Sequence, residues 1–253
     1  MSTYSARRRR HHSTAYILIV TLIAAAVCVG IVFAVISAAG LRYIKIEVSD
    51  GATAKFFGRV DGAGDPISGR LFFSDGTTAT LDRNTGEVTY SNGDVYRGGL
   101  DGPLRDGEGV MIYANGDRYE GTFAGDLISG NGTFTFANQD IYRGSFENGK
   151  KEGEGTYIWA DGSSYTGGYK NDRKNGKGTY IWADGATFTG TFVDDLKQGE
   201  GEFHFANGDV YVGEYVDDMR TGQGTYTWAN GESYTGEFYQ NVMHGYGTYS
   251  WPS

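Results

Sequence analysis

The sequence has little cysteine, proline and histidine, and each shortage excludes a class of protein. One cysteine among 253 residues excludes a disulfide framework, a cysteine-rich zinc site and an iron–sulfur cluster. Three prolines exclude collagen and proline-rich disordered tracts. Four histidines, two of them in the pair His11-His12, leave little for a histidine metal site. We therefore expect no metal and no cofactor.

Glycine and aromatic residues are abundant instead. The chain has 41 glycines, about twice the usual share of near 7%. It also has 19 tyrosines, and 15% of its residues are aromatic, which argues against a disordered chain of low hydrophobicity. Many glycines and tyrosines with few prolines favour short strands joined by tight turns.

A long uncharged stretch lies near the N-terminus. No Asp, Glu, Lys or Arg occurs from Ser13 to Leu41. Residues 16–39 are apolar and long enough to cross a hydrocarbon core of about 30 Å as a helix. A cleaved signal peptide is the alternative, since residues 37–39 are small, but its apolar core is usually only about 7–15 residues long. We expect an uncleaved transmembrane helix at 16–39.

Basic residues predict the orientation of this helix. Four arginines, at 7–10, precede it, and only Arg42 and Lys45 follow closely. The positive-inside rule then places residues 1–15 in the cytoplasm as a basic tail. The prediction is a single-pass membrane protein with residues 41–253 outside the cytoplasm.

The C-terminal part of the chain repeats every 23 residues. Each unit starts with an aromatic residue, at Tyr96, Tyr119, Tyr142, Tyr165, Phe188, Tyr211 and Tyr234. A glycine follows two positions later, then a second apolar or aromatic residue, a Gly-x-Gly, and two apolar residues two positions apart. Residues two apart share one face of a strand. Each unit is therefore predicted to hold two antiparallel strands, such as Ser164–Tyr169 and Gly178–Trp182, and the whole to form an elongated β-meander.

Two kinds of connection are expected between these strands. Dipeptides such as Asp161-Gly162 predict a hairpin turn with positive φ at both central residues. Asn138-Gln139 lacks the glycine, so we expect a strained or looser turn there. The other connection is predicted as a loop of seven to nine residues, such as Lys170–Lys177, ending in the Gly-x-Gly, which allows a bulge. The first aromatic of each unit is expected to pack over a glycine of a neighbouring strand.

The order Tyr-x-Gly-x-Phe, Gly-x-Gly and aromatic pair resembles the MORN (membrane occupation and recognition nexus) repeat. The resemblance covers Tyr96–Trp251 and recurs seven times in register. The family often has His before the first glycine of Gly-x-Gly, and only His244 fits here. The predicted fold class is all-β: an elongated antiparallel meander of seven repeats over 96–253, preceded by one transmembrane helix.

Residues 41–95 carry a weaker form of the pattern. Residues 41–48 alternate as a strand does, and Ser49-Asp50-Gly51 is expected to turn the chain back. Two further strands are expected around Phe56 and around Leu71, and residues 80–88 are expected to form a hairpin with a shortened loop. Because terminal repeats are usually atypical, we interpret 41–95 as degenerate repeats that cap the array.

The charge of the repeats argues against two kinds of partner. From Tyr96 to Ser253 there are 12 Lys and Arg against 23 Asp and Glu, a net charge of −11. Nucleic acid and anionic lipid attract basic surfaces, so neither is an expected ligand of the repeats. Paired aspartates such as Asp194-Asp195 could bind calcium, but no EF-hand-like spacing supports this.

One basic position nevertheless recurs at a constant offset. It holds Arg105, Lys151, Lys174, Lys197 and Arg220. Acidic residues flank it, so we interpret it as a solvated loop edge of mixed charge. A row of contacts for one partner is the functional alternative.

The aromatic pairs after Gly-x-Gly are the candidate binding residues. They form either the core of the sheet or an open groove for a partner or glycan. The candidate residues are Tyr157, Trp159, Tyr180, Trp182, Tyr226, Trp228 and Trp251. His204 alternates with Phe203 and Phe205, so it is expected on the opposite, exposed face.

No constellation of catalytic residues accompanies the repeats, so we expect that the protein is not an enzyme. The predicted function is a membrane-tethered repeat scaffold that binds another protein or copies of itself. The alternative is a cell-surface module that binds a glycan or cell-wall polymer through the aromatic groove.

Overall fold

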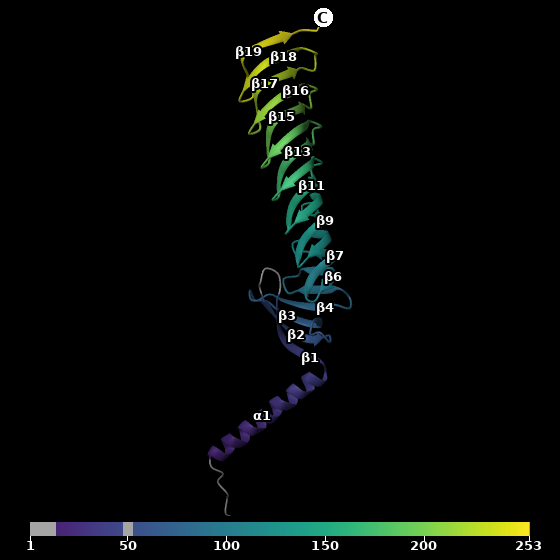
Figure 1. Cartoon of the computed structure of the whole chain (residues 1–253), viewed down its shortest axis with the longest axis vertical. Coiled ribbons are helices and arrows are strands. Elements are labelled where there is room, and N and C mark those ends of the chain that lie inside the picture. Colours follow the sequence, from purple (N-terminus) through teal and green to yellow (C-terminus); the bar gives the residue numbers. More distant parts are fainter. Residues whose placement is uncertain (1–13, 48–52, 253) are drawn as a thin grey trace, which may run out of the picture.

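The structure is a computed structural model that describes residues 14–47 and 53–252. These residues form one helix and 19 strands, arranged as a long rod with the helix at one end (Figure 1). The predicted basic tail, up to residue 13, and the predicted turn Ser49-Asp50-Gly51 lie outside the described residues.

The strands fall into two groups, which we call the base (β1–β5) and the array (β6–β19). The base consists of β1 (Leu41–Glu47), β2 (Thr53–Val60), β3 (Pro66–Phe72), β4 (Thr78–Asp82) and β5 (Glu87–Tyr90). The array consists of β6 (Val95–Asp101), β7 (Leu104–Ile112), β8 (Arg118–Ala124), β9 (Leu127–Thr135), β10 (Ile141–Glu147), β11 (Lys150–Ile158), β12 (Ser164–Lys170), β13 (Arg173–Ile181), β14 (Thr187–Val193), β15 (Leu196–His204), β16 (Val210–Val216), β17 (Met219–Thr227), β18 (Ser233–Tyr239) and β19 (Val242–Ser250).

The sheet is a simple meander, which confirms the predicted fold class. Each strand pairs antiparallel with the next along the chain, from β1 with β2 to β18 with β19. In each repeat the glycines of the two strands face each other, as Gly167 faces Gly178. The register then shifts just beyond this pair, which confirms the bulge expected at Gly-x-Gly.

The predicted long loop is wrong. Lys170–Lys177 is a hairpin whose turn is only Asn171-Asp172, because the Gly-x-Gly segment belongs to β13. Both turn residues have positive φ, 48° for Asn171 and 71° for Asp172. Asn and Asp tolerate this left-handed conformation better than other residues that carry a side chain, so these dipeptides can turn the chain without glycine.

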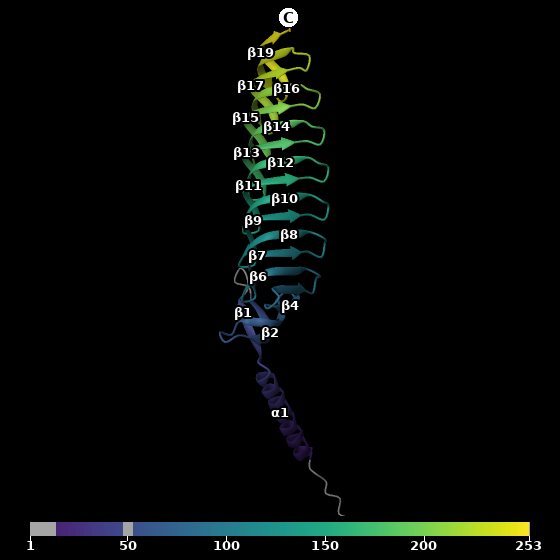
Figure 2. The ribbon, with the colours of Figure 1, turned by 90° about the vertical axis from the view of Figure 1, so that its right-hand side faces the viewer.

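The glycine-containing connection is instead a wider loop, and the wider loops all project from one side of the rod (Figure 2). In Tyr113–Asp117 the Tyr113 N–H donates to the Asp117 carbonyl at 2.9 Å. Only Gly116 has positive φ, so the expectation of two such residues is wrong. Asn115 accepts the Asp117 N–H through its side chain instead. Gln139 takes the place of the glycine with φ 76° and keeps the same backbone bonds, so that turn is strained but not looser.

The core of the array is a column of rings, each seated on two glycines. The ring of Tyr165 is fully buried. A Cβ placed on Gly167 or Gly178 would lie within 2.7 Å of the Tyr165 hydroxyl. The first aromatic of every repeat has this arrangement, which confirms the predicted packing of ring over glycine. We call the face of the sheet that carries these rings the inner face.

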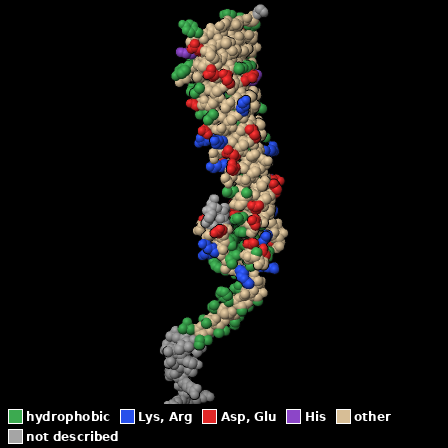
Figure 3. All heavy atoms as spheres, viewed as in Figure 1, with side chains coloured by type: hydrophobic (Ala, Val, Ile, Leu, Met, Phe, Trp, Pro, Cys, Tyr) green, Lys and Arg blue, Asp and Glu red, His purple; other side chains and the backbone are tan. Residues whose placement is uncertain are grey.

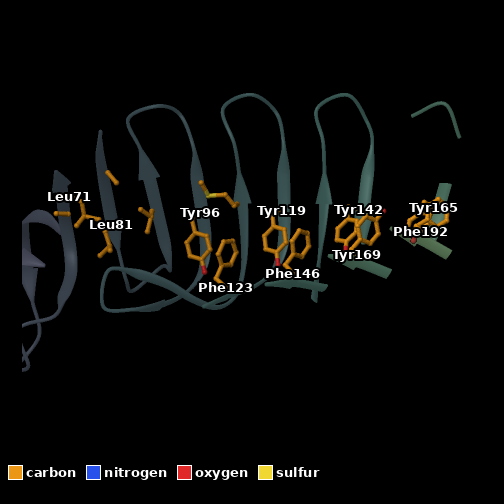
Figure 4. Packing of buried hydrophobic residues seen from close by; sticks show 14 of the residues in the cluster. Leu71, Leu81, Tyr96, Tyr119, Phe123, Tyr142, Phe146, Tyr165, Tyr169 and Phe192 are labelled. Carbon is orange, nitrogen blue, oxygen red and sulfur yellow. The ribbon is translucent and has the colours of Figure 1, made fainter. Parts of the chain in front are cut away.

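The second aromatic of each repeat links consecutive units. Tyr169 lies edge-on to Tyr165 of its own repeat and to Tyr142 of the preceding one, with centroids 5.3 and 5.2 Å apart. Tyr165 and Tyr169 are four residues apart on one strand, a span of about 13 Å in an unbent strand. Their rings can meet because the Tyr165 ring lies along the strand over Gly167, which has no side chain to separate it from Tyr169. Figure 4 shows these ring pairs side by side along the array.

The base repeats this packing once and then becomes aliphatic. Phe56 is fully buried over Gly58 and Gly69, as the array rings are over their glycines. Leu71 and Leu81 then continue the core in place of rings (Figure 4). The predicted hairpin over residues 80–88 is present as β4 and β5.

The helix α1 (Thr14–Ala38) covers most of the predicted span at 16–39. Among the described residues it is the one helix that is long and apolar enough to cross a membrane, judged by length and composition alone. Its apolar side chains, such as Leu22 and Phe33, are exposed. Only two residues, Ala39 and Gly40, separate it from β1.

Candidate binding groove

A continuous row of aromatic side chains runs along the inner face beside the buried column. We call this set the aromatic row: Tyr113, Phe134, Phe136, Tyr157, Trp159, Tyr180, Trp182, Phe203, Phe205, Tyr226, Trp228, Tyr249 and Trp251. Each ring contacts the next, with centroids 4.4–5.9 Å apart and no break. The row exists because each pair alternates onto the inner face and neighbouring strands carry the pairs in register.

The seven predicted site residues all belong to this row. Six of them are partly buried and pack against the core or its neighbours: Tyr157, Trp159, Tyr180, Trp182, Tyr226 and Trp228. Trp251, beyond the last strand, is 70% exposed. The rings are therefore packed on one side and open on the other, so the row combines features of both predicted alternatives, core and groove.

The basic row consists of the recurring basic residues Arg105, Lys151, Lys174, Lys197 and Arg220. It was predicted to be a solvated loop edge, and this prediction is wrong, because the side chains turn inward over the rings. The Lys174 Nζ lies 5.7 Å from the Tyr165 centroid and 5.3 Å from the Tyr180 centroid. The Lys197 Nζ lies within 5.7 Å of four ring centroids, and its side chain is only 17% exposed. A cation within about 6 Å of a ring face is attracted by the ring quadrupole, so these cations join the aromatic column to the aromatic row.

A signal for this placement was present in the sequence. Lys174 lies six residues before Tyr180, an even number, so the two share a face of any strand that contains both. The strand β13 does contain both, and Lys174 is the cross-strand partner of Tyr169. The signal was lost because this segment was interpreted as a loop.

Three of the inward cations, Arg105, Lys174 and Lys197, form an ion pair with an aspartate of the next hairpin turn, whereas Arg220 bonds there to Asn241. The Lys197 Nζ lies 3.7 Å from Asp218, and the Arg105 Nε lies 3.0 Å from Asp126. The same aspartates accept the backbone N–H of the basic residue, at 3.0 Å for Asp218. Burial lowers the pKa of Lys197, and Asp218 opposes that effect. The paired aspartates at the turns are thus structural, and no group of three or more His, Cys, Asp or Glu that could hold a metal occurs among the described residues.

A second set of carboxylates supports the aromatic row from the wider loops. Asp209 accepts hydrogen bonds from the Tyr226 hydroxyl and from the Ala229 N–H. The Tyr226 hydrogen bond contributes most to lowering the pKa of Asp209, with the Ala229 N–H next. Burial, together with Asp209, raises the pKa of Tyr226 to about 12. Tyr157 bonds to Asp140 in the same way, at 2.8 Å, so these loops fix the ring orientations.

Small hollows recur between the two rows. One of about 240 Å³ is lined by the basic pair Lys151 and Lys174, the rings Tyr157, Trp159 and Tyr169, and two aspartates. An equivalent hollow of about 150 Å³ lies two repeats further along the chain, among Lys197, Arg220, Phe203 and Phe205. The groove therefore offers the same combination of ring face, cation and carboxylate at two sites that lie two repeats apart.

The opposite face of the array is polar for the most part, with exposed aliphatic residues such as Ile181 and Val212. His204 is exposed there beside Glu202, as predicted. Threonine hydroxyls pair across strands, for example Thr179 with Thr189 at 3.0 Å. Figure 3 shows acidic and basic side chains interspersed along the rod. This mixed face offers none of the repeated ring surface that distinguishes the inner one.

The chain belongs to the MORN repeat family. Seven consecutive segments match the MORN repeat, at 104–118, 119–141, 142–164, 165–187, 188–210, 211–233 and 234–253, which together make up more than half of the chain. Their boundaries have the period and phase of the repeat described above. The search of curated proteins found no match to this sequence.

Solved structures resemble the chain only distantly. The TCP10 domain of Danio rerio CPAP, solved with a peptide of Danio rerio STIL, is 14% identical with a TM-score of 0.40, over 78% of this chain and 94% of that one. The TCP domain of Drosophila melanogaster SAS-4, solved with a proline-rich motif of Ana2, is 23% identical with a TM-score of 0.33, over 51% and 72% of the two chains. At these scores the likeness carries no functional argument.

Proposed function

We propose that this protein is a membrane-tethered MORN scaffold whose inner groove binds an extended polypeptide segment of a partner. The observation that carries the proposal is the unbroken aromatic row, half-buried and open on one side from Tyr113 to Trp251. A row of ring faces at a constant interval suits a ligand that repeats at the same interval. The groove lysines Lys174 and Lys197 are paired with Asp195 and Asp218, which favours binding over catalysis.

The interval favours the polyproline II conformation. Neighbouring strands lie about 4.7–4.9 Å apart, so equivalent rings recur every two strands, at about 9.4–9.8 Å. A polyproline II helix has three residues per turn and rises about 3.1 Å per residue, or about 9.3 Å per turn. Such a segment presents the same side to every repeat, and aromatic grooves are a known way to recognise it.

The polar groups of the groove fit the same ligand. Polyproline II makes no internal hydrogen bonds, so its carbonyls need external donors. The Lys151 and Lys174 ammonium groups line the hollow next to Trp159 and can supply them. Because Lys174 and Lys197 already face Asp195 and Asp218, the groove carries little net charge and suits an uncharged ligand.

Tryptophan fluorescence tests the proposal directly, because all four tryptophans belong to the aromatic row. A proline-rich peptide titrated into the full chain in lipid nanodiscs should shift this emission saturably. Trp182→Ala combined with Trp228→Ala should weaken the affinity at least tenfold, since anchoring aromatics dominate such interfaces. Tyr239→Ala, an exposed ring outside the row, is the matched control and should bind as the parent does. Absence of any shift, or equal affinity for all variants, would contradict the proposal.

A glycan or wall polymer is the second candidate, favoured by the adjoining, partly exposed rings of Tyr157 and Trp159, whose centroids lie 4.6 Å apart. The same titration with soluble wall oligosaccharides separates the two classes. Saturable binding of the saccharide, but not of the peptide, lost in the double tryptophan variant, would select the glycan.

Self-association has a separate route through the last strand. β19 pairs with β18 on one side, and its residues are exposed, Tyr246 by 90%. Unpaired strand edges can pair with another chain. Light scattering of the full chain in detergent should show dimers or larger species that Val242→Lys reduces, and a strict monomer would count against this route.

The tether and its orientation belong to the same proposal. We propose that α1 spans the bilayer with the N-terminus in the cytoplasm and the array outside it. Protease added to intact cells should then digest the array. Survival of the array in intact cells, with digestion after lysis, would overturn the orientation.

A further inference from the structure

The base carries an exposed face that differs from every other surface of the sheet. Side chains that alternate outward on β1–β3 form a block of three aromatics and four cations, with one carboxylate, Glu47, at the end of β1. The residues of this base face are Tyr43, Lys45, Lys55, Phe57, Arg59, Arg70 and Phe72, all exposed. Tyr43 is the cross-strand partner of Phe57, and Phe57 of Arg70, while Lys55 lies between Lys45 and Phe72.

The cations of the base face lack carboxylate partners of the kind that Lys174 and Lys197 have in the array. Among the described residues, Lys45, Lys55 and Arg59 take part in no ion pair, and Arg70 bonds only to the Thr78 hydroxyl, at 3.3 Å, while it lies over Phe72. Lys45 and Lys55 face each other directly. Like charges at directly opposite positions destabilise a sheet, so this pair is better suited to a bound anion than to an isolated surface.

The base face continues into the apolar surface of α1. A hollow of about 500 Å³, lined mainly by apolar atoms, lies between the last helical turns and the first two strands. Phe33 and Ile36 of α1 line it together with Tyr43 and Phe57 of the base face. Figure 3 shows the hydrophobic helix leading directly into the end of the rod where basic side chains gather.

We propose that the base face docks on the bilayer that holds α1, with its cations on anionic lipid headgroups and its aromatics at the interface. The inference rests on the proposed tether. Tyrosine and other aromatic rings favour the membrane–water interface, and basic residues next to a span attract anionic lipid. A helix that ends two residues before β1 keeps Tyr43 and Lys45 near the headgroups whatever the tilt of the rod.

The partner is a lipid surface, because the distribution of charge and apolar area matches one. The cations and rings are mixed on one flat strand face and are contiguous with a helix of mean hydropathy high enough to span a bilayer. Docking would also fix the direction in which the groove leaves the membrane, since the base and the array belong to one sheet.

Quenching by bromolipids tests the proposal on the full chain in nanodiscs. The substitution Phe57→Trp places a reporter on the base face, whereas the nearest native tryptophan, after β11, lies roughly 40 Å away along the sheet. Emission of Phe57→Trp should be quenched by brominated phosphatidylcholine, and more strongly when phosphatidylglycerol is included. Added salt should reverse that increase, because it screens exposed charges.

Charge variants sharpen the test. Lys45→Gln combined with Lys55→Gln should lower the anionic-lipid-dependent docking equilibrium about 30-fold, since each basic residue near the surface is worth roughly fivefold. Lys170→Gln combined with Arg173→Gln removes a facing basic pair in the array and is the matched control. It should leave the quenching unchanged, and circular dichroism checks that both variants fold.

A reporter within α1 separates this inference from the tether itself. Quenching of Phe33→Trp without quenching of Phe57→Trp would keep the anchor and overturn the docking. Quenching of neither would overturn both. The role of the cations would be overturned if quenching of Phe57→Trp were the same with and without anionic lipid and were unchanged by the lysine substitutions.

Discussion

The base and the array are built from the same antiparallel hairpins, yet they treat buried and charged side chains differently. In the array, rings fill the core, and the inward cations Arg105, Lys174 and Lys197 form ion pairs with aspartates of the next turn. In the base, aliphatic Leu71 and Leu81 fill the core, and Lys45 and Lys55 face each other on the outside. The two regions therefore differ in which of their side chains remain available to bind a partner.

That difference separates two binding modes. The array pairs inward cations such as Lys174 and Lys197 with aspartates and leaves ring faces open, so its groove suits an uncharged extended ligand. The base leaves cations and rings open together beside an apolar helix, so it suits a charged interface. In both regions the backbone supplies the spacing, and the side chains at a few repeated positions decide the chemistry.

The largest expected difference between the two regions is in their stability at high pH. Burial raises the pKa of Tyr96, Tyr119, Tyr165 and Tyr211 from 10 to about 12. Because the folded state holds these protons, the phenols contribute their full stability below pH 10 and lose it as the pH rises toward 12. The array should therefore unfold in this range while Phe56, Leu71 and Leu81 keep β2–β4 folded.

Tyrosinate absorbance, followed together with hydrogen exchange of β2–β4 and β12–β17, checks this prediction. Release of the phenolic protons near pH 10 with no change in exchange would contradict it. So would simultaneous loss of the base.

Removing one ring from the column is the next largest effect. Tyr165→Ala should lower the free energy of unfolding by about 3–5 kcal/mol, because it empties a buried site over two glycines. Tyr165→Phe should cost only about 1 kcal/mol, the contribution of one hydrogen bond, here the bond to the Gly168 carbonyl. Phe188 already occupies the same position in the next repeat.

Urea unfolding monitored by tryptophan fluorescence measures both costs. In the base, Phe56→Ala should be as costly, since Phe56 sits on Gly58 and Gly69 in the same way. A small effect of Phe56→Ala would show that the shared packing does not extend into the base.

These packing positions were predicted from the sequence, whereas the two-residue turns and the inward position of the cations were missed. The 23-residue period locates each ring and each glycine, because strand alternation and the missing Cβ are local properties. Asn171-Asp172 as a complete turn could not be recognised, since the bulge hides how far β13 extends. That error also concealed the inward position of Lys174 and the structural role of Asp195.

Neutralising one cation in each region tests the charge comparison. Lys197→Met should lower the free energy of unfolding by about 1–2 kcal/mol, since it removes a desolvated cation from four rings. Lys55→Met should change it by less than about 0.5 kcal/mol, as expected for an exposed position. Thermal unfolding in detergent measures both. Equal losses of unfolding free energy in the two variants would contradict the distinction between Lys197, which contacts rings and Asp218, and the exposed Lys55.

The smallest expected effect concerns the one irregular wide loop of the array. Gln139 adopts φ 76° where the other units have glycine. Gln139→Gly should stabilise the array by up to about 1 kcal/mol, because a left-handed conformation costs about 1–2 kcal/mol and the greater freedom of unfolded glycine offsets part of that gain. A loss of stability in chemical denaturation would show that the glutamine side chain has a role of its own.

Hydrogen exchange of the full chain in anionic nanodiscs, with and without a proline-rich peptide, tests the division between the two regions most directly. Compared with neutral nanodiscs, anionic lipid should protect β1–β3 and leave the array unchanged, whereas the peptide should protect β11–β17 and leave β1–β3 unchanged. Protection of the base by the peptide, or of the array by the lipid, would contradict the account.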